Sequence, residues 1–382
     1  MPPPRPLARW SLISTLSSKA RSSHCVSVTN TGTCLVYAGE LKPRTPIDDS
    51  SDLRGCLHTF DLKSLLGANR GSGGTSVQDR GSILSPGPSS VPQPRVGAAS
   101  TWSVRDKAMY MWGGRGGVDM APLGKEEAGM WKATLQLEGG GEGVRWERAD
   151  APGEEPESRS YHTIVSLKDH IYVHAGCPTT GRVGSLQSFN VVSRIWKELA
   201  CAPEPGRGGT ALAIATLKNE GDVLLRFGGF AGYELPKDNT LDIYTITTNT
   251  WRTLTPSPDP QHGYPGPRSV HGFHSFTSPS PSLSNAIAIL WHGEREASAL
   301  GHAGAGAFWD DVWVLLDKPE SDGTEWMKVS VDDVGEGGKP EGRGWFEPAG
   351  WVDEKGEMKI VMFGGLVGSN ERSGELWVLE VE

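Results

Sequence analysis

The chain has 382 residues, enough for one large β domain or for two or three domains of average size. Its 37 Lys and Arg against 46 Asp and Glu give a net charge of −9, which argues against bulk binding to nucleic acid or to an anionic membrane, because both need a basic face. No stretch approaches 18 consecutive apolar residues, and residues 1–16 lack the apolar core of a secretory signal, so the sequence predicts neither a membrane span nor export.

The composition favours many short strands joined by turns. Glycine occurs 50 times and proline 27 times, yet 14 tryptophans and 37% hydrophobic residues are too many for a disordered chain. The five cysteines are odd in number and lack Cys-x-x-Cys spacing. They indicate reduced thiols, mostly buried, in a cytoplasmic protein.

An apolar run that ends in a small residue and a glycine recurs six times along the chain. The copies are Cys34–Gly39, Met109–Gly114, Ile171–Gly176, Leu224–Gly229, Ile289–Gly293 and Ile360–Gly365. After a variable loop, each copy is followed by a second short strand. These strands are expected at Leu57–Leu62, Trp131–Leu137, Leu186–Val191, Leu241–Ile246, Asp311–Leu316 and Glu375–Glu380.

Two further elements complete each unit. A tryptophan followed three residues later by an apolar residue marks a fourth strand, as in Trp146/Ala149, Trp196/Leu199, Trp251/Leu254 and Trp326/Val329. Ahead of each glycine pair lies another strand that begins with arginine. The six openings are Arg21–His24, Arg95–Ala98, Arg159–His162, Arg207–Thr210, Arg268–His271 and Arg343–Phe346.

This order of elements resembles the kelch repeat, which has four strands per unit and a glycine doublet after the second strand. The resemblance covers nearly the whole chain and implies a β-propeller with one four-stranded blade per repeat around a central channel. We therefore expect an all-β fold, a single six-bladed kelch propeller over residues 1–382. The blades are predicted at approximately 21–85, 95–150, 159–200, 207–256, 268–331 and 343–382 plus 8–14.

The two ends of the chain predict how the ring closes. The last repeat stops after its third strand, while an orphan tryptophan segment, residues 8–14, stands at the other end. If Trp10 and Ile13 form the fourth strand of the last blade, closure pairs backbone groups that would otherwise lie on exposed edges. The first repeat is the weakest, because its fourth strand near Gln78–Leu84 has no tryptophan. Five regular blades with an inserted segment is the alternative.

Strand direction alternates within an up-and-down blade, so the arginine openings and the loops after the glycine pairs are expected on one face. That face is where binding chemistry is predicted, since loops on a rigid scaffold carry it. Arginine at this repeat position can bond neighbouring loop carbonyls, a structural role that would recur in every blade. The alternative is that Arg95, Arg159, Arg207 and Arg268 bind the anionic group of a substrate. The histidines three residues later, His24, His162 and His271, are predicted to be core residues.

The loop of the fifth repeat, residues 291–311, is long and rich in Gly and Ala, so it can lie close to a ligand. Its Gly293-Glu294 and Gly301-His302-x-Gly304-x-Gly306-x-Phe308 resemble the matching loop of nitrile-specifier proteins and their fungal relatives. Those kelch propellers act on glucosinolate breakdown products. They bind Fe(II) through Glu-x-x-x-Asp-x-x-x-His and hold the anionic group of the substrate with arginines, which Arg95 and Arg159 match by repeat position.

The resemblance implies that Glu294 and His302 are catalytic residues or Fe(II) ligands. The middle position is Ser298 instead of Asp, and serine is a poor ligand for Fe(II). Glu296 or Asp310 could replace the missing carboxylate; otherwise Glu294 and His302 bond the loop backbone or touch an organic substrate. No cofactor is certain on this pattern, with Fe(II) the one candidate.

Three functions stay open. The first is a small-molecule enzyme of specialised metabolism, a lyase or isomerase resembling nitrile-specifier proteins, or a cyclase or pericyclase of fungal secondary metabolism, acting on a polar or anionic substrate. Such chemistry could need only positioning and hydrogen bonds to developing charge. The second is a kelch scaffold that binds a protein partner without catalysis. The third is a metal-dependent oxidase. No dinucleotide, P-loop, nucleophile-elbow or His-Glu-x-x-His motif is present.

Overall fold

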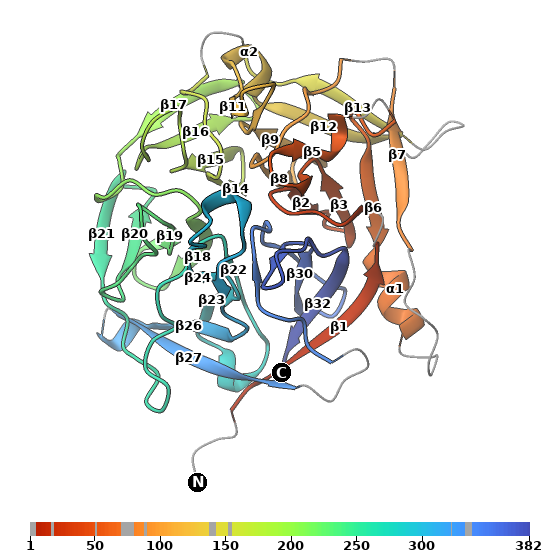
Figure 1. The fold of residues 1–382 in the computed structure, drawn as a ribbon. Coiled ribbons are helices and arrows are strands. Elements are labelled where there is room, and N and C mark those ends of the chain that lie inside the picture. The colour runs from red at the N-terminus through yellow and green to blue at the C-terminus, as the bar shows by residue number, and fades with distance from the viewer. Residues whose placement is uncertain are drawn as a thin grey trace.

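Six four-stranded antiparallel sheets surround a central channel in the computed structural model, which describes residues 5–16, 19–49, 52–69, 80–87, 90–136, 143–151, 155–321, 323–332 and 338–382. The first strand of each sheet lies at the centre and the fourth at the rim (Figure 1). This arrangement is a six-bladed β-propeller, so the predicted fold class is confirmed.

The blades follow one another along the chain. Blade 1 is β2 (Cys25–Val28), β3 (Thr33–Tyr37), β6 (Leu57–Asp61) and β7 (Ser82–Pro86); blade 2 is β8 (Ala99–Ser103), β9 (Ala108–Trp112), β12 (Trp131–Gln136) and β13 (Gly143–Arg148); blade 3 is β14 (Thr163–Leu167), β15 (His170–His174), β16 (Leu186–Asn190) and β17 (Ile195–Leu199). Blade 4 is β18 (Ala211–Leu217), β19 (Gly221–Phe227), β20 (Leu241–Thr245) and β21 (Thr250–Leu254); blade 5 is β22 (Gly272–Ser275), β23 (Ala286–Trp291), β26 (Val312–Lys318) and β27 (Gly323–Asp332); blade 6 is β29 (Ala349–Val352), β30 (Met358–Phe363), β32 (Glu375–Val381) and β1 (Leu7–Thr15).

Short hairpins extend from one face, mostly from the loop between the second and third strands of a blade. They are β4 (Glu40–Lys42) with β5 (Thr45–Pro46), β10 (Arg115–Gly116) with β11 (Ala121–Pro122), and β24 (Glu294–Glu296) with β25 (Ala307–Phe308). A further two-stranded ladder pairs β28 (Arg343–Gly344) with β31 (Leu366–Val367), which β29 and β30 separate along the chain. Two short α-helices, α1 (Leu62–Asn69) and α2 (Lys125–Ala128), and the 3-10 turns Ile47–Asp49, Pro281–Leu283, Gly301–Ala303 and Pro319–Ser321 complete the described elements. None of these helices has the length and apolar character needed to cross a membrane.

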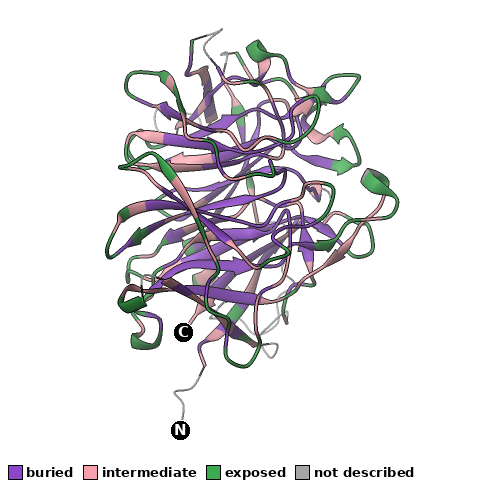
Figure 2. Cartoon of the chain, turned by 90° about the vertical axis from the view of Figure 1, so that its left-hand side faces the viewer, coloured by how far each residue is buried: buried purple, intermediate pink, exposed green. Residues whose placement is uncertain are grey.

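The hydrophobic core lies between adjacent blades, because each strand buries alternate side chains against the neighbouring sheet. Between blades 4 and 5, for example, Leu225 and Ile243 pack with Phe273 and Trp326, all at most 1% exposed. Figure 2 shows buried residues along the strands and exposed residues in the turns at both faces. The predicted core histidines are also buried between blades: His162 meets Trp112 edge-on at 4.9 Å, and His24 meets Phe363 at 5.4 Å.

The N-terminal strand closes the ring. Strand β1 pairs antiparallel with β32 from Ala8↔Val381 to Thr15↔Glu375, and Trp10 is 3% exposed. The start of β1 also pairs in parallel with β27 of blade 5, and Arg5 beyond it forms an ion pair of 3.0 Å with Asp259. The predicted closure by residues 8–14 is therefore confirmed.

Two sets of backbone hydrogen bonds join the inner ends of the blades. Each blade has a two-residue doublet that ends in glycine after its second strand, and this glycine donates its N–H to the carbonyl of the opening arginine of the next blade at 2.8–3.3 Å. The six doublets are Ala38–Gly39, Gly113–Gly114, Ala175–Gly176, Gly228–Gly229, His292–Gly293 and Gly364–Gly365. Both residues of every doublet have positive φ, with 94–110° at the second position, which explains why that position is always glycine.

The second set is a closed ring of six hydrogen bonds around the channel, here called the mouth ring. Its members stand two residues after each opening arginine: Ser23, Gly97, Tyr161, Gly209, Val270 and Trp345. Each N–H donates to the carbonyl of the member in the preceding blade at 2.7–3.0 Å, and Ser23 of blade 1 donates to Trp345 of blade 6. All six members have φ between 46° and 62°. The left-handed conformation turns each N–H and C=O toward its neighbouring blades, so the ring closes on itself.

Removing residues 1–16 should lower the melting temperature by roughly 5 °C or more, because it opens the ring and exposes the free edge of β32. Thermal unfolding followed by circular dichroism measures the change. A synthetic peptide of residues 5–16, added in excess, should restore much of the loss. An unchanged melting temperature in the shortened chain would contradict closure by β1.

The mouth ring can be tested with two alanine substitutions at positive φ. Gly209→Ala forces a left-handed alanine and places its Cβ 2.8 Å from Phe230 Cε1 and Val270 Cγ1. Gly232→Ala also forces a left-handed alanine, but its Cβ has no neighbouring atom within 4 Å. We expect Gly232→Ala to cost about 1 kcal/mol of unfolding free energy. Gly209→Ala should cost about 1–3 kcal/mol more, from overpacking. Equal losses in urea unfolding would argue that the ring position is not crowded.

Candidate functional site

A cavity of about 190 Å³ opens above the mouth ring, on the face that carries the glycine doublets. It is built largely from one repeat position, the residue directly after each doublet. In every blade, this residue pairs by backbone β-bridge hydrogen bonding with the residue that follows the opening arginine, as in Ser22↔Glu40 and Ser269↔Glu294. Five of the six residues at this position line the cavity: Glu40, Arg115, Phe230, Glu294 and Leu366. The sixth is the buried Cys177.

Aromatic rings form an apolar part of the cavity wall. Tyr161 and Trp345, both members of the mouth ring, meet edge-to-face with centroids 5.2 Å apart. Phe230 lies 6.3 Å from Trp345. Because Tyr161 and Trp345 are fixed by the ring hydrogen bonds, this part of the site is positioned by the scaffold itself.

Two arginines bring positive charge to the cavity without a carboxylate partner among the described residues. Arg115 donates through Nε to Ser160 Oγ at 2.8 Å, and its guanidinium lies 5.4 Å from the centroid of the Tyr161 ring. Arg182 lies over Phe230 at 4.9 Å. Stacking on these rings orients the planar forks, which suit bidentate recognition of a sulfate, phosphate or carboxylate. The protein's own cations already cover these aromatic faces, so the geometry favours an anionic ligand over a cationic one.

A pair of buried carboxyls stands on another side of the cavity. Glu294, 5% exposed, follows the doublet of blade 5, and Glu234, 6% exposed, comes from the loop after β19 of blade 4. Burial and the negative charge of Glu234 raise the pKa of Glu294 to about 8. Burial also raises the pKa of Glu234, while its hydrogen bond with Glu294 opposes the rise. The shared proton therefore resides on Glu294 at neutral pH, and Trp345 Nε1 donates to Glu294 Oε2 at 3.3 Å.

The third cavity carboxyl, Glu40, has protein partners. Arg372 Nη2 donates to Glu40 Oε1 at 3.3 Å, and the backbone N–H of Arg44 donates to Oε2 at 2.7 Å. Glu40 therefore binds the loops of blades 1 and 6 together, whereas the Glu234–Glu294 pair is left to face the cavity.

The opening arginines predicted to bind substrate lie elsewhere. Arg95, Arg159, Arg207 and Arg268 are 0–5% exposed, and none of them lines the cavity. Arg95 donates to the carbonyls of Gln93, Gly113 and Glu127 at 2.8–2.9 Å. Arg268 donates to His292 O and to both carboxylate oxygens of Asp311.

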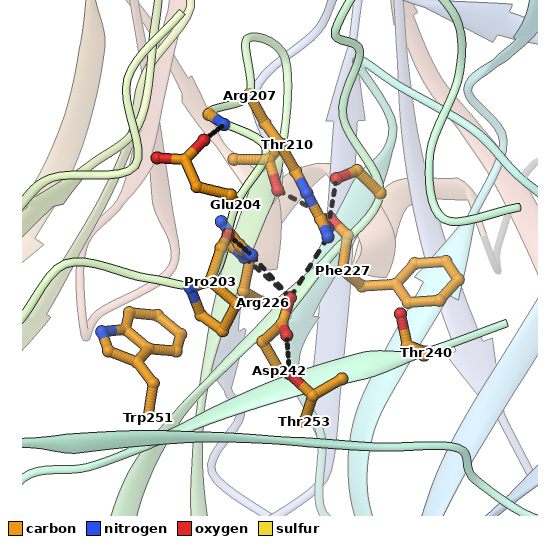
Figure 3. A network of polar contacts seen from close by, with 12 residues as sticks. Pro203, Glu204, Arg207, Thr210, Arg226, Phe227, Thr240, Asp242, Trp251 and Thr253 are labelled. Carbon is orange, nitrogen blue, oxygen red and sulfur yellow. Dashed lines mark hydrogen bonds and ion pairs between the residues drawn. The ribbon is translucent and has the colours of Figure 1, made fainter. Parts of the chain in front are cut away.

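The other two opening arginines are held by side chains. Arg207 and Arg226 converge on Asp242, which also accepts from Thr253 (Figure 3). Arg159 departs from the repeat, because it binds Ser185 Oγ and Gln187 Oε1 and lies over Trp112. These contacts agree with the structural alternative for the opening arginines. Their predicted role in substrate binding stays a prediction that their position does not favour.

The loop of blade 5 contributes to the cavity as a hairpin. Glu294 lies at its base, and Ala297, Ser298, Gly301 and Gly304 line the cavity. His302 lies within the turn Gly301–Ala303, but its side chain is outside the described part of the structure, so its predicted catalytic or ligand role stays untested.

The donor set does not fit the Fe(II) centre that the resemblance implies. Ser298 Oγ, at the position of the missing Asp, accepts the backbone N–H of Leu300 at 3.1 Å and so serves the loop. Glu294 shares its proton with Glu234, and the alternative ligand Asp310 forms an ion pair with Lys339 at 2.8 Å. Among the side chains that the structure describes, no three of His, Cys, Asp and Glu come together as metal ligands. We derive no step through iron.

Sequence reasoning found Glu294 but missed Arg115, Arg182 and Glu234. One signal was present for Arg115: the residue after the doublet varies between repeats, as Glu, Arg, Cys, Phe, Glu and Leu, while the doublet glycine does not. A position that is equivalent in space but variable in chemistry is where a repeat protein places its ligand contacts. No repeat-based signal marks Arg182 or Glu234, which stand further along loops of unequal length.

Comparison with known proteins identifies the repeat. The family described as the KLHDC2/KLHL20/DRC7 Kelch-repeats domain matches residues 82–279, a little over half of the chain. The chain belongs to the kelch-repeat family. The kelch propeller is also 23% identical, over 94% of its length and 92% of the relative's, to an N-(sulfonatooxy)prop-2-enimidothioate sulfolyase from Thlaspi arvense. A solved structure described as "Structure of YjhT" superposes with a TM-score of 0.62 at 14% identity, covering 97% of this chain and 100% of that one, and supports the fold.

Substitutions at two arginines of blade 2 can distinguish a ligand-binding role from a structural role in the kelch propeller. Arg115→Gln should leave the melting temperature nearly unchanged and weaken the binding of inorganic sulfate, measured by calorimetry, because one fork of the anion site is lost. Arg95→Gln removes buried bonds to three carbonyls and should cost about 3 kcal/mol or more of stability. Sulfate affinity that depends on Arg95 and not on Arg115 would support anion binding by the opening arginines and contradict the role given to Arg115.

Proposed function

We propose that this kelch propeller is a small-molecule enzyme of the lyase or isomerase type, acting in the mouth cavity on a substrate with an anionic group. The observation that carries the proposal is the pairing of two features in one cavity. Arg115 and Arg182, in blades 2 and 3, offer guanidinium groups that have no carboxylate partner among the described residues, and Glu294 offers a protonated carboxyl in blade 5. Blades 2 and 5 are three apart in a ring of six, so Arg115 and Glu294 stand on opposite sides of the mouth.

This arrangement supports acid catalysis on a held anion. The two forks would bind and orient the anionic group and stabilise negative charge that develops there. Glu294, neutral at pH 7, would donate its proton or a hydrogen bond to a leaving or rearranging atom. The negative charge of Glu234 would stabilise the protonated form of Glu294 and favour its reprotonation after each turnover. The apolar wall of Tyr161, Phe230 and Trp345 lines the cavity and would shield the reacting atoms of a bound substrate from water. Positioning, proton donation and stabilisation of developing charge can suffice for some reactions of the lyase, isomerase or pericyclase type.

The Thlaspi relative supports the anionic substrate class, because its name describes a lyase of a sulfonatooxy compound. N-(sulfonatooxy)prop-2-enimidothioate is therefore the first substrate to assay, with product analysis by mass spectrometry and with and without added Fe(II). Turnover that Arg115→Gln and Glu294→Gln abolish would support the proposal.

A protein-binding scaffold is the second candidate. Leu41, Val118, Tyr233 and Leu300 expose apolar side chains on the loops that follow the glycine doublets, around the same face. If pull-downs recover a stoichiometric partner whose binding these side chains control, while no small molecule binds the cavity, the scaffold reading replaces the enzyme.

The pH dependence tests the acid role of Glu294. Its active form is the protonated one, so kcat should be level at mildly acidic pH and fall as pH rises through about 8. Glu294→Gln keeps the shape but removes the proton and should lower kcat by about 100-fold or more. Glu40→Gln, a matched control in the same cavity, should keep the wild-type pH profile. A Glu294→Gln variant that retains full turnover would contradict the assignment.

A further inference from the structure

A third arginine reaches the mouth cavity from blade 1. Arg44 stands in the turn between β4 and β5, and its exposed residue lines the cavity together with Arg115 and Arg182. Like those two, it has no carboxylate partner among the residues that the structure describes. The three arginines come from three consecutive blades, so positive charge follows one side of the mouth.

Backbone hydrogen bonds hold the Arg44 turn at the cavity. The N–H of Arg44 donates to Oε2 of Glu40 at 2.7 Å, so the turn folds back on the carboxyl at the base of its own hairpin. At the other end of the hairpin, Ile47 donates its N–H to Gly39 O at 2.8 Å. Arg44 has a left-handed φ of 58°, and Pro43 before it also lines the cavity. The turn is therefore fixed so that Arg44 borders the mouth.

Arg115 and Arg182 act near one point, on the far side of Arg115 from blade 1. Burial raises the pKa of the Cys177 thiol, and the positive charges of Arg182 and Arg115 both oppose this rise. The two guanidinium groups therefore lie close to the same position of blade 3. A ligand that meets Arg44 as well needs a second charged group, directed toward blade 1.

The carboxyls of the cavity offset only part of the positive charge. Glu40 is already paired with Arg372 at 3.3 Å. Glu234 and Glu294 share a proton, so the pair carries one negative charge at neutral pH. Three arginines against one carboxylate leave the lining with two positive charges. A ligand with two negative charges matches this excess, whereas a ligand with one leaves positive charge uncompensated at the mouth.

We propose that the mouth cavity selects small ligands with two separate oxyanion groups, one held by Arg115 and Arg182 and the other by Arg44. The inference rests on the proposed function, because it names the substrate class for the same cavity. Arg44 is then a residue that determines specificity, since it adds affinity only for ligands that carry the second group. The planar guanidinium fork suits a carboxylate, sulfonate or phosphate at this position.

Pairs of nearly isosteric sulfonates that differ by one charge test the inference. The probes are 4-sulfobenzoate and 4-sulfobenzamide, and 3-sulfobenzoate and 3-sulfobenzamide, so that two spacings are sampled. Calorimetry at pH 7 and low ionic strength should show at least one carboxylate binding about fivefold or more tightly than its own amide. Equal affinity of carboxylate and amide at both spacings would overturn the inference and leave the anion site of Arg115 and Arg182 standing. Failure of all four probes to bind would overturn the inference together with the proposed function.

Three variants assign the preference to Arg44. Arg44→Gln should reduce it to about twofold or less, with the amide affinity and the melting temperature nearly unchanged, because the side chain is exposed. Lys42→Gln removes a charge from the same hairpin at a residue that does not line the cavity, and should keep the wild-type preference. Arg115→Gln should weaken carboxylate and amide by a similar factor. A preference that survives Arg44→Gln, or that Lys42→Gln reduces as strongly, would contradict the inference.

Discussion

The mouth ring is the constraint on which the rest of the structure depends. Six backbone N–H groups donate to six carbonyls in a closed circle, and every member accepts a left-handed conformation to make it possible. For Val270, a β-branched residue at φ 46°, that conformation is costly, so the ring must hold it in place. Hydrogen bonds in a closed chain polarise one another, which stiffens the inner ends of all six blades at once.

The ring separates two kinds of repeated position. The opening arginine and the second doublet glycine are tied to it and to each other by bonds that recur around the circle, so their chemistry is fixed by the fold. The residue after the doublet has its backbone fixed by a β-bridge, but its side chain is free to vary, and in five of the six blades it lines the mouth cavity. The result is a rigid circle of positions occupied by Glu, Arg, Cys, Phe, Glu and Leu, in which a sixfold scaffold presents an asymmetric site.

The fold was predictable because six copies of one pattern repeat in order, and because an orphan tryptophan strand at the start matches a missing strand at the end. The helix α1 and the hairpins after the doublets were not predicted, since they belong to loop insertions that no repeat constrains. The site was only partly predictable. Glu294 stands in the most individual loop and was found, whereas a conspicuous repeat of arginine drew attention to Arg95, Arg159, Arg207 and Arg268. Their regularity marks them as structural; Arg115 and Arg182 break the pattern and reach the cavity.

The most direct test of the account is a crystal structure of the protein soaked with benzenesulfonate. The account predicts the sulfonate between the guanidinium groups of Arg115 and Arg182, the ring of the ligand against Tyr161 and Trp345, and the six hydrogen bonds of the mouth ring unchanged. A sulfonate bound instead by Arg95, Arg159, Arg207 or Arg268, with the blade ends opened to admit it, would contradict the division between structural and ligand-binding positions.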